Sequence, residues 1–352
     1  RAKAFNPPIM GWFLRSLNML PVYRVRDGLS SVQKNNAIFD LCYDYLKNQE
    51  SVLVFAEANH NLKRRIRPLS KGFTRIAFGA EEKYDWDLDI QIVPVGVNYS
   101  SHREGRNHVH IKFGECIPVS KFKEAYIADE NEASMQMKDE VSDAMKKLVF
   151  HVEDLDEYSV HKILWEELEA DNTTITDPDI SNARIQKTDA HITPELIEEA
   201  KELDKLADKH KVSLKDVAIG KQISAKDVVL SPLYIFSFLN NIIPYQPIKY
   251  LISNVIKDRA FDASIKYISG LFLLPIFYGI VAAVLAIVGV DSAFIYGYLV
   301  LSVFTAPFFT RAKELFTKNS AQQIEKSKPA VYQEIKSQLE AFKKLRQTIL
   351  NE

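Results

Sequence analysis

Length, composition and charge already exclude several classes of protein. The chain has 352 residues, of which 47% are hydrophobic and 26% charged, so it can form one large domain or two ordinary ones around a packed core. The formal net charge of −1 argues against a bulk nucleic-acid binder and requires any anion site to be a local cluster. The two cysteines, Cys42 and Cys116, have no metal-ligand spacing, which favours a reducing compartment without a disulfide framework.

The first zone of the chain, residues 1–150, alternates helical and strand-like segments. Residues 32–47 place apolar side chains with helical spacing, and residues 71–79 begin a second helix. Apolar or alternating runs predict strands at 52–56, 90–99 and 108–113. Since strands that alternate with helices are typical of α/β domains, we predict a mixed sheet flanked by helices.

The second zone, residues 151–227, is polar and predicts a helical insert. Thr193 followed by Pro194 is typical of a helix start, and a charged helix follows over 194–211. Capping-box spacing predicts two further helix starts, at Ser213 with Asp216 and at Ser224 with Asp227. Short helices of this kind suit a segment that connects two larger parts of the chain.

The third zone contains two long apolar runs. Residues 267–290 are 24 uncharged residues in a row, and residues 292–310 are 19 more, with Asp291 between them. About 20 apolar residues suffice for a helix to cross the hydrocarbon, so the pattern predicts a transmembrane helical hairpin over 267–310. Lysines and arginines flank both ends, which favours cytoplasmic ends and an external tip. The alternative is a pair of core helices in a globular protein.

Two segments flank this hairpin. Residues 228–256 begin with an uncharged run that prolines interrupt (Pro232, Pro244 and Pro247), so we predict an interfacial or re-entrant segment there. The tail, 320–352, places apolar residues with helical spacing and predicts an amphipathic helix. That helix could lie on the bilayer or pack on a partner helix.

A polar and basic stretch follows the first predicted strand. Glu57 stands where the strand ends, a position at which α/β folds concentrate ligand sites. Five cations come after it: Lys63, Arg64, Arg65, Arg67 and Lys71. They could form a funnel for a polyanion, a face for anionic lipid head groups, or a solvated charge run. A helix that starts at Gly72 would favour a phosphate at its exposed N-terminus.

Three segments, in this order, resemble sequence blocks of the glycerolipid acyltransferases, which acylate glycerol 3-phosphate and lysophosphatidate. The first, PVYR at 21–24, holds Arg24 at the place of the family arginine, with Asn18 at the place of the family glycine. The second, FAEANHN at 55–61, corresponds to the family's FPEGTRS, and the third, IVPV at 92–95, to an apolar run with V-P-V. The resemblance covers about residues 1–120.

This resemblance implies a membrane-anchored enzyme with an α/β acyltransferase domain on the cytoplasmic face. It implies transfer of a fatty acyl group from acyl-CoA or acyl carrier protein to glycerol 3-phosphate or lysophosphatidate, with no metal, no other cofactor and no nucleic-acid partner. Arg24 suits a phosphate because its guanidinium is a planar fork of donors. Glu57 would accept hydrogen bonds from glycerol hydroxyls or orient the loop through backbone amides. The substrate-binding residues so indicated are Arg24, Glu57, Asn59, His60, Lys71 and Gly72.

The family's general base is a His-x-x-x-x-Asp pair ahead of the first block, in which the aspartate orients the imidazole. Residues 1–17 contain no histidine, so we expect this pair upstream of Arg1 and no catalytic residue within the chain. His151 and Asp156 have the spacing, but they follow the third block and are rejected as the pair. His60 does not qualify, because an arginine stands five positions after it.

A protein of another class fits the same features. It is a non-catalytic, membrane-anchored lipid-binding protein that keeps the scaffold without the base. The presence of a His-x-x-x-x-Asp pair upstream of the first block distinguishes the enzyme from this alternative.

Overall fold

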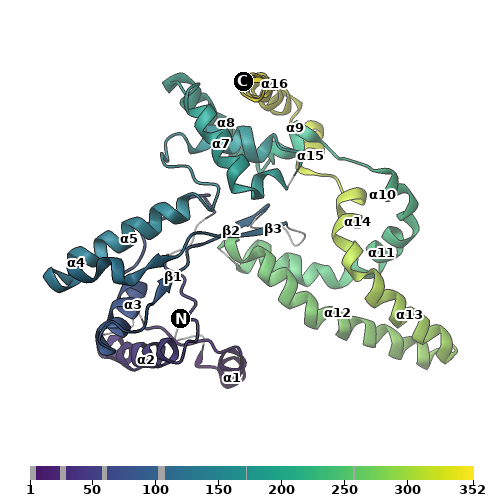
Figure 1. Ribbon diagram of the computed structural model, residues 1–352. Helices are drawn as coiled ribbons and strands as arrows, with labels where there is room; N and C mark the ends of the chain where they lie inside the picture. Colours follow the sequence, from purple (N-terminus) through teal and green to yellow (C-terminus); the bar gives the residue numbers. More distant parts are fainter. Residues whose placement is uncertain (1–4, 24–28, 58–61, 102–107, 172, 257) are drawn as a thin grey trace. The chain divides into compact units, whose positions relative to one another are not determined.

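The computed structural model describes residues 5–23, 29–57, 62–101, 108–171, 173–256 and 258–352 (Figure 1). The chain folds as two compact units, which are described separately below. Unit 1 comprises Arg1–His60, Ile66–Gly96 and Lys112–Leu148, and unit 2 comprises Asn61–Arg65, Val97–Ile111 and Val149–Glu352.

Unit 1 combines helices with short strands. Its helices are α1 (Pro8–Ser16), α2 (Leu29–Lys47), α3 (Gly72–Lys83), α4 (Lys123–Ala128) and α5 (Glu130–Lys146), with a 3-10 turn at Val119–Phe122. Strands β1 (Gln91–Ile92) and β4 (Ile117–Pro118) pair antiparallel, with Gln91 opposite Pro118. Strand β2 (Val95–Tyr99) pairs with β3 (Val109–Phe113), and the residues of this second sheet are divided between the two units.

The predicted mixed sheet is much smaller than expected. The described residues form two sheets of two strands each. The predicted strand 52–56 is wrong: Leu53 and Phe55 are 80% and 83% exposed, and the described ladder there is a single antiparallel bridge between Glu57 and Leu69. The predicted strand 90–99 is divided into β1 and β2 at Pro94, because proline has no N–H to donate to a ladder. The predicted helices are confirmed as α2 and α3.

An aromatic cluster holds α3 in place within unit 1. The ring of Phe78 stacks on Tyr126 at 4.6 Å and meets the edge of Phe122 at 6.4 Å. Trp86 closes the cluster against Tyr126 at 5.7 Å. On the neighbouring helix, Tyr43 lies so close to Gly79 that a Cβ there would collide with its ring, so α2 and α3 pack tightly. The core therefore fixes α3, whose N-terminus directly follows the basic stretch.

Unit 2 is almost entirely helical. Its first part holds α6 (Tyr158–Lys162), a π-turn (Ile163–Glu167), a 3-10 turn (Thr174–Thr176), α7 (Pro178–Asp189), α8 (Pro194–His210), α9 (Leu214–Ile219) and α10 (Ala225–Val229). The second part holds α11 (Ser231–Tyr250), a π-turn (Leu251–Val255), a 3-10 turn (Arg259–Phe261), α12 (Asp262–Ile287), α13 (Ser292–Thr305), a 3-10 turn (Ala306–Phe308), α14 (Phe309–Phe316), α15 (Ser320–Ser327) and α16 (Pro329–Asn351). The three predicted caps are confirmed, since the hydroxyls of Thr193, Ser213 and Ser224 accept from backbone amides of the first turns of α8, α9 and α10.

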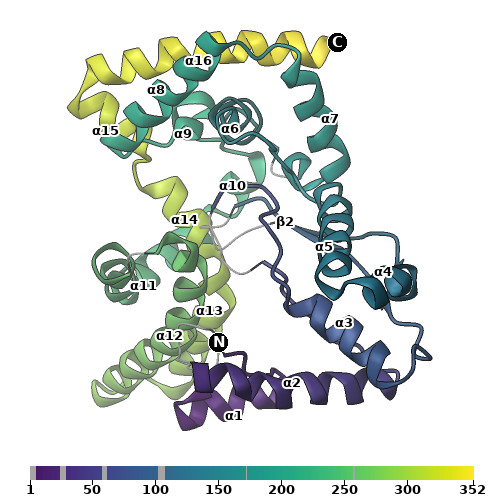
Figure 2. The ribbon, with the colours of Figure 1, turned by 90° about the vertical axis from the view of Figure 1, so that its left-hand side faces the viewer.

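The predicted insert and the C-terminal tail form one hydrophobic core. Helix α16 places Ile335, Leu339 and Phe342 among buried residues of 150–214, including Trp165 and Leu203. Figure 2 shows α16 running along α8 and α9, with which it makes contacts. The predicted amphipathic helix therefore packs its apolar face on other helices of the chain, and the alternative that this face lies on the bilayer does not fit.

Two helical stretches, Asp262–Ile287 and Ser292–Ser327, are long and apolar enough to span a membrane. Their apolar side chains are not covered by other described parts of the chain. Phe272 of α12 is 63% exposed and Phe294 of α13 is 75% exposed. The alternative of two core helices in a globular protein does not fit this exposure, because core side chains are removed from solvent.

Helix α11 lies beside α12 and α13 (Figure 1) and contacts both. Polar side chains bond across these contacts. The Tyr278 hydroxyl donates to Asn241 Oδ1 at 2.5 Å, and the Tyr298 hydroxyl donates to Asn240 Oδ1 at 3.0 Å. In an apolar environment such interhelical hydrogen bonds hold helices together, since each group otherwise has no partner. The expected interruption at the prolines is wrong, because the helix continues through Pro244 and Pro247.

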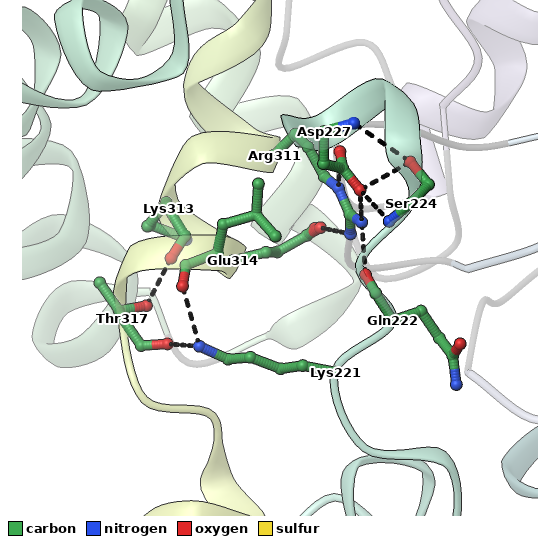
Figure 3. A network of polar contacts seen from close by, with 9 residues as sticks. Lys221, Gln222, Ser224, Asp227, Arg311, Lys313, Glu314 and Thr317 are labelled. Atoms are coloured by element: carbon green, nitrogen blue, oxygen red, sulfur yellow. Dashed lines mark hydrogen bonds and ion pairs between the residues drawn. The ribbon is translucent and has the colours of Figure 1, made fainter. Parts of the chain in front are cut away.

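A polar network fastens the chain that enters the hairpin to the chain that leaves it (Figure 3). Arg311 donates to Asp227 from Nε at 3.0 Å and from Nη2 at 2.7 Å, and it also donates to the Gln222 carbonyl at 2.6 Å. Lys221 adds bonds to the carbonyls of Leu315 and Thr317. Arg311 holds the pKa of the buried Asp227 carboxyl well below its usual range, so the bond is fully formed at neutral pH and is lost only in strong acid.

We predict that Arg311→Ala lowers the free energy of unfolding by about 2–4 kcal/mol. This is somewhat less than for a fully enclosed pair, because the Arg311 side chain is 27% exposed while that of Asp227 is 6% exposed. Glu314→Ala is the control, since it removes the exposed partner of the same arginine and should cost less than about 1 kcal/mol. Thermal unfolding of the two variants in detergent measures the difference, and equal losses would contradict a central role for Asp227.

Candidate functional site

Among the predicted substrate-binding residues, Glu57 is held by an arginine of the same loop. Arg67 donates to Glu57 Oε2 from Nε at 3.0 Å and from Nη2 at 2.7 Å. The Glu57 side chain is 24% exposed and that of Arg67 21%, so solvent reaches the pair, although most of its surface is covered by protein. Because the Glu57–Leu69 bridge and the Ser70 N–H bond to the Ala56 carbonyl also join the two ends of the loop, the carboxylate has a fixed direction.

Lys71 and Gly72 stand at the beginning of α3. The Lys71 ammonium donates to Asn131 Oδ1 at 3.1 Å, which directs it toward the first turn of α5. At Gly72 a Cβ would meet only the Ser70 hydroxyl, at an ordinary distance of 3.8 Å, so packing among the described residues does not require a glycine. The α3 amides of this turn, with a lysine beside them, are suited to an anionic group that approaches closely.

The five cations after Glu57 are divided between the two units, with Lys63, Arg64 and Arg65 in unit 2 and Arg67 and Lys71 in unit 1. Arg64 is buried in unit 2, where its guanidinium donates to the carbonyls of Tyr99 at 2.6 Å and Ser100 at 3.2 Å. Its Nε lies 3.0 Å from Glu166 Oε1. In contrast, Arg67 serves Glu57 in unit 1. Arg64 therefore has a structural role that the surrounding sequence does not indicate.

Three predicted site residues, Arg24, Asn59 and His60, lie outside the described residues. The position just before Arg24 is nevertheless well defined. The Asn35 side chain of α2 accepts from the Tyr23 N–H at 3.0 Å and donates to the Tyr23 carbonyl at 2.9 Å. Asn35 was not singled out from the sequence, and a lone asparagine in a helical pattern carries no signal that would have identified it. The two bonds of Asn35 fix the backbone of Tyr23, the residue before Arg24.

The rejected pair, His151 and Asp156, is engaged elsewhere. His151 Nε2 lies 2.8 Å from Glu153 Oε2, and Asp156 accepts from Lys201 at 2.9 Å. The Lys201 bond lowers the pKa of the Asp156 carboxyl. These contacts fit the rejection of the two residues as a catalytic pair.

The arrangement in unit 1 offers groups that bind rather than groups that take a proton. A carboxylate held by an arginine can accept from a hydroxyl, and the start of α3 can receive an anion. The described part of unit 1 contains no histidine. The geometry therefore describes one side of a site, on which a polar, anionic ligand is held.

Comparison with known proteins supports this interpretation. Residues 1–98 match the family described as Acyltransferase. "Glycerol-3-phosphate O-acyltransferase 1" of Saccharomyces cerevisiae is 24% identical over 86 residues, which are 24% of this chain and 11% of the yeast protein. No solved structure matches the chain. Residues 1–98 of this chain are therefore similar to the acyltransferase family, and the yeast relative supports a likeness to glycerolipid acyltransferases.

Proposed function

We propose that this chain is part of a membrane-anchored acyltransferase of phospholipid synthesis. It would transfer a fatty acyl group from acyl-CoA or acyl carrier protein to the hydroxyl of glycerol 3-phosphate or lysophosphatidate. The observation that carries the proposal is the match of residues 1–98 to the acyltransferase family, within which Glu57 and its partner Arg67 stand. The chain spans about a tenth of the yeast relative's length, so the acceptor and the donor are part of the proposal.

The proposed reaction is an acyl transfer from a thioester to an alcohol. The acceptor oxygen bonds to the thioester carbonyl carbon, the carbon–sulfur bond breaks, and the hydroxyl proton leaves through a general base and ends on the released thiol. Glu57 would accept a hydrogen bond from an acceptor hydroxyl and so orient it for attack. Arg67 would hold Glu57 in a fixed direction, because both of its bonds end on Glu57 Oε2.

The acceptor's phosphate would be bound by groups from two segments of the sequence. Arg24 offers a planar donor fork, and the start of α3 adds backbone amides at Gly72 with Lys71 beside them. Asn59 and His60, which follow Glu57 in the sequence, would line the same loop. A single phosphate bound in this way brings the neighbouring hydroxyls of a glycerol backbone toward Glu57.

The membrane anchor would be the hairpin of α12 and α13. Both are apolar and exposed, and α11 would lie with them in the bilayer because its asparagines bond to Tyr278 and Tyr298. Both ends of the hairpin return to the helical core of unit 2, which α16 completes, so they would lie on one side of the membrane. The positive charge at both ends favours the cytoplasmic side.

The first prediction concerns the acceptor. In the full-length protein, Arg24→Ala should raise the Michaelis constant for a phosphorylated acceptor roughly 10- to 150-fold, which corresponds to the loss of about 1.5–3 kcal/mol for a charged hydrogen bond. The constant for acyl-CoA should stay the same. Arg15→Ala is the matched control, since Arg15 of α1 packs over the ring of Phe5. An unchanged constant for the acceptor would show that Arg24 is structural, and binding without any release of thiol would favour the non-catalytic lipid-binding protein.

The second prediction tests whether Glu57 and Arg67 act as a unit. Glu57→Ala and Arg67→Ala should each lower the rate of transfer, and the double variant should be little worse than either, with a coupling energy of about 1–3 kcal/mol. The matched control is the exposed pair of Lys121 and Glu140 in the same unit, whose ion pair of 2.6 Å should give less than about 1 kcal/mol. Strictly additive losses at Glu57 and Arg67 would mean that the arginine does not act through the carboxylate.

The third prediction tests the membrane topology. In a background of Cys42→Ala and Cys116→Ser, a cysteine at Val288 near the exposed tip should react with a membrane-impermeant maleimide added to intact cells. A cysteine at the exposed Glu325 in α15 should react only after the cells are permeabilised. If both positions react from the same side, the hairpin does not cross the bilayer.

A further inference from the structure

A recess in unit 2, outside the acyltransferase segment, gathers histidine and carboxylate side chains. Its volume is about 540 Å³, and its lining includes His151, Glu153, Asp154, Glu157, His161 and Asp189. Glu157 immediately precedes α6, His161 lies within α6, and Asp189 is the last residue of α7. Two helices thus meet at the recess with ligand-bearing side chains at their ends.

His161 is the residue that requires an explanation. It is 1% exposed, and among the described residues neither of its ring nitrogens has a hydrogen-bond partner. Its Nε2 lies 3.3 Å from Asp189 Oδ1, but without the alignment of a hydrogen bond. Leaving a buried polar group without a partner is destabilising, and such a group in a native structure calls for an explanation such as a bound ion.

The spacing of the three side chains fits a single ion. Glu157 and His161 are four residues apart, which places both on one face of a helical turn. Their ligand atoms and that of Asp189 all lie within 4.8 Å of one another. Tetrahedral coordination at about 2.1 Å would place such atoms about 3.4 Å apart, a small further approach. Glu157 is half-buried and Asp189 exposed, so both carboxylates can rotate while His161 stays fixed.

The end of α7 is held where such a site needs it. The indole N–H of the buried Trp165 donates to the Thr188 hydroxyl at 3.0 Å. The Thr188 hydroxyl in turn donates to the Arg184 carbonyl at 2.7 Å, and the His191 N–H donates to the Thr188 carbonyl at 2.8 Å. These bonds to Thr188, the residue before Asp189, fix the Asp189 backbone opposite α6. The position of Asp189 therefore does not depend on the ion.

We propose that Glu157, His161 and Asp189 form a binding site for one zinc ion. An imidazole nitrogen with two carboxylates suits Zn²⁺, whereas Mg²⁺ and Ca²⁺ prefer oxygen ligands alone. Three protein ligands leave one position for water, and the ion would fasten α6 to α7.

The experiment is a zinc titration of the full chain, purified in detergent without a histidine tag and stripped with a chelator. We expect one Zn²⁺ per chain, a higher unfolding temperature with zinc, no competition from excess Mg²⁺, and visible absorption bands of a low-symmetry site when Co²⁺ replaces Zn²⁺. His161→Asn should weaken binding at least about 100-fold, because loss of an outer partner alone costs about 10- to 100-fold.

Two further variants keep the test decisive. Asp189→Asn changes an exposed side chain and should weaken zinc binding at least about tenfold even if His161→Asn fails to fold. His191→Asn is the matched control, since its ring also lies beside a carboxylate, 2.9 Å from Glu352, but outside the recess. Its zinc affinity should equal that of the parent chain. Absence of stoichiometric binding to the parent chain, or equal affinity in Asp189→Asn, would overturn the assignment.

Discussion

The buried indole of Trp165 is the contact on which the organisation of unit 2 depends. It is 1% exposed, with the guanidinium of Arg184 5.0 Å from the ring and that of Arg346 5.6 Å from it. Both arginines also bond to Glu169 Oε2, at 2.8 Å and 2.9 Å. One ring thereby joins α7 and α16, which are far apart in the sequence, because cation–π contacts and a shared carboxylate compensate for burying the charges.

This contact places a constraint on the apolar hairpin. Since α16 completes a core begun by residues 150–214, the chain must return to that core after α12 and α13. The bonds between Asp227 of α10 and Arg311 of α14 join the segment that precedes the hairpin to the segment that follows it. In the proposed membrane anchor, a hairpin closed in this way would have both ends on one side, in agreement with the basic residues at both ends.

The sequence predicted most of what is decided locally and little of what is decided by distant contacts. Thr193, Ser213 and Ser224 were identified as caps because a cap needs only the next three residues. The prediction of a strand at 52–56 was wrong, because an apolar run does not show whether a neighbouring strand is present to pair with it. Phe55 in this run is largely exposed. Arg64 could not be separated from Arg67 by any local rule, since its partners at Tyr99 and Glu166 lie far along the chain.

The same distinction explains what was found and missed at the candidate sites. Glu57 was identified from its place after an apolar run and from the family resemblance, but its partner Arg67 was one of five similar cations until the structure joined the two. Glu157 and His161 have a spacing that sequence alone shows, whereas Asp189 reaches them only because Trp165 bonds to Thr188. The residue that centres the helical core therefore also positions the third ligand of the proposed zinc site. Zinc at this point would reinforce a contact that already exists between α6 and α7, so its contribution would add to the packing around Trp165 rather than replace it.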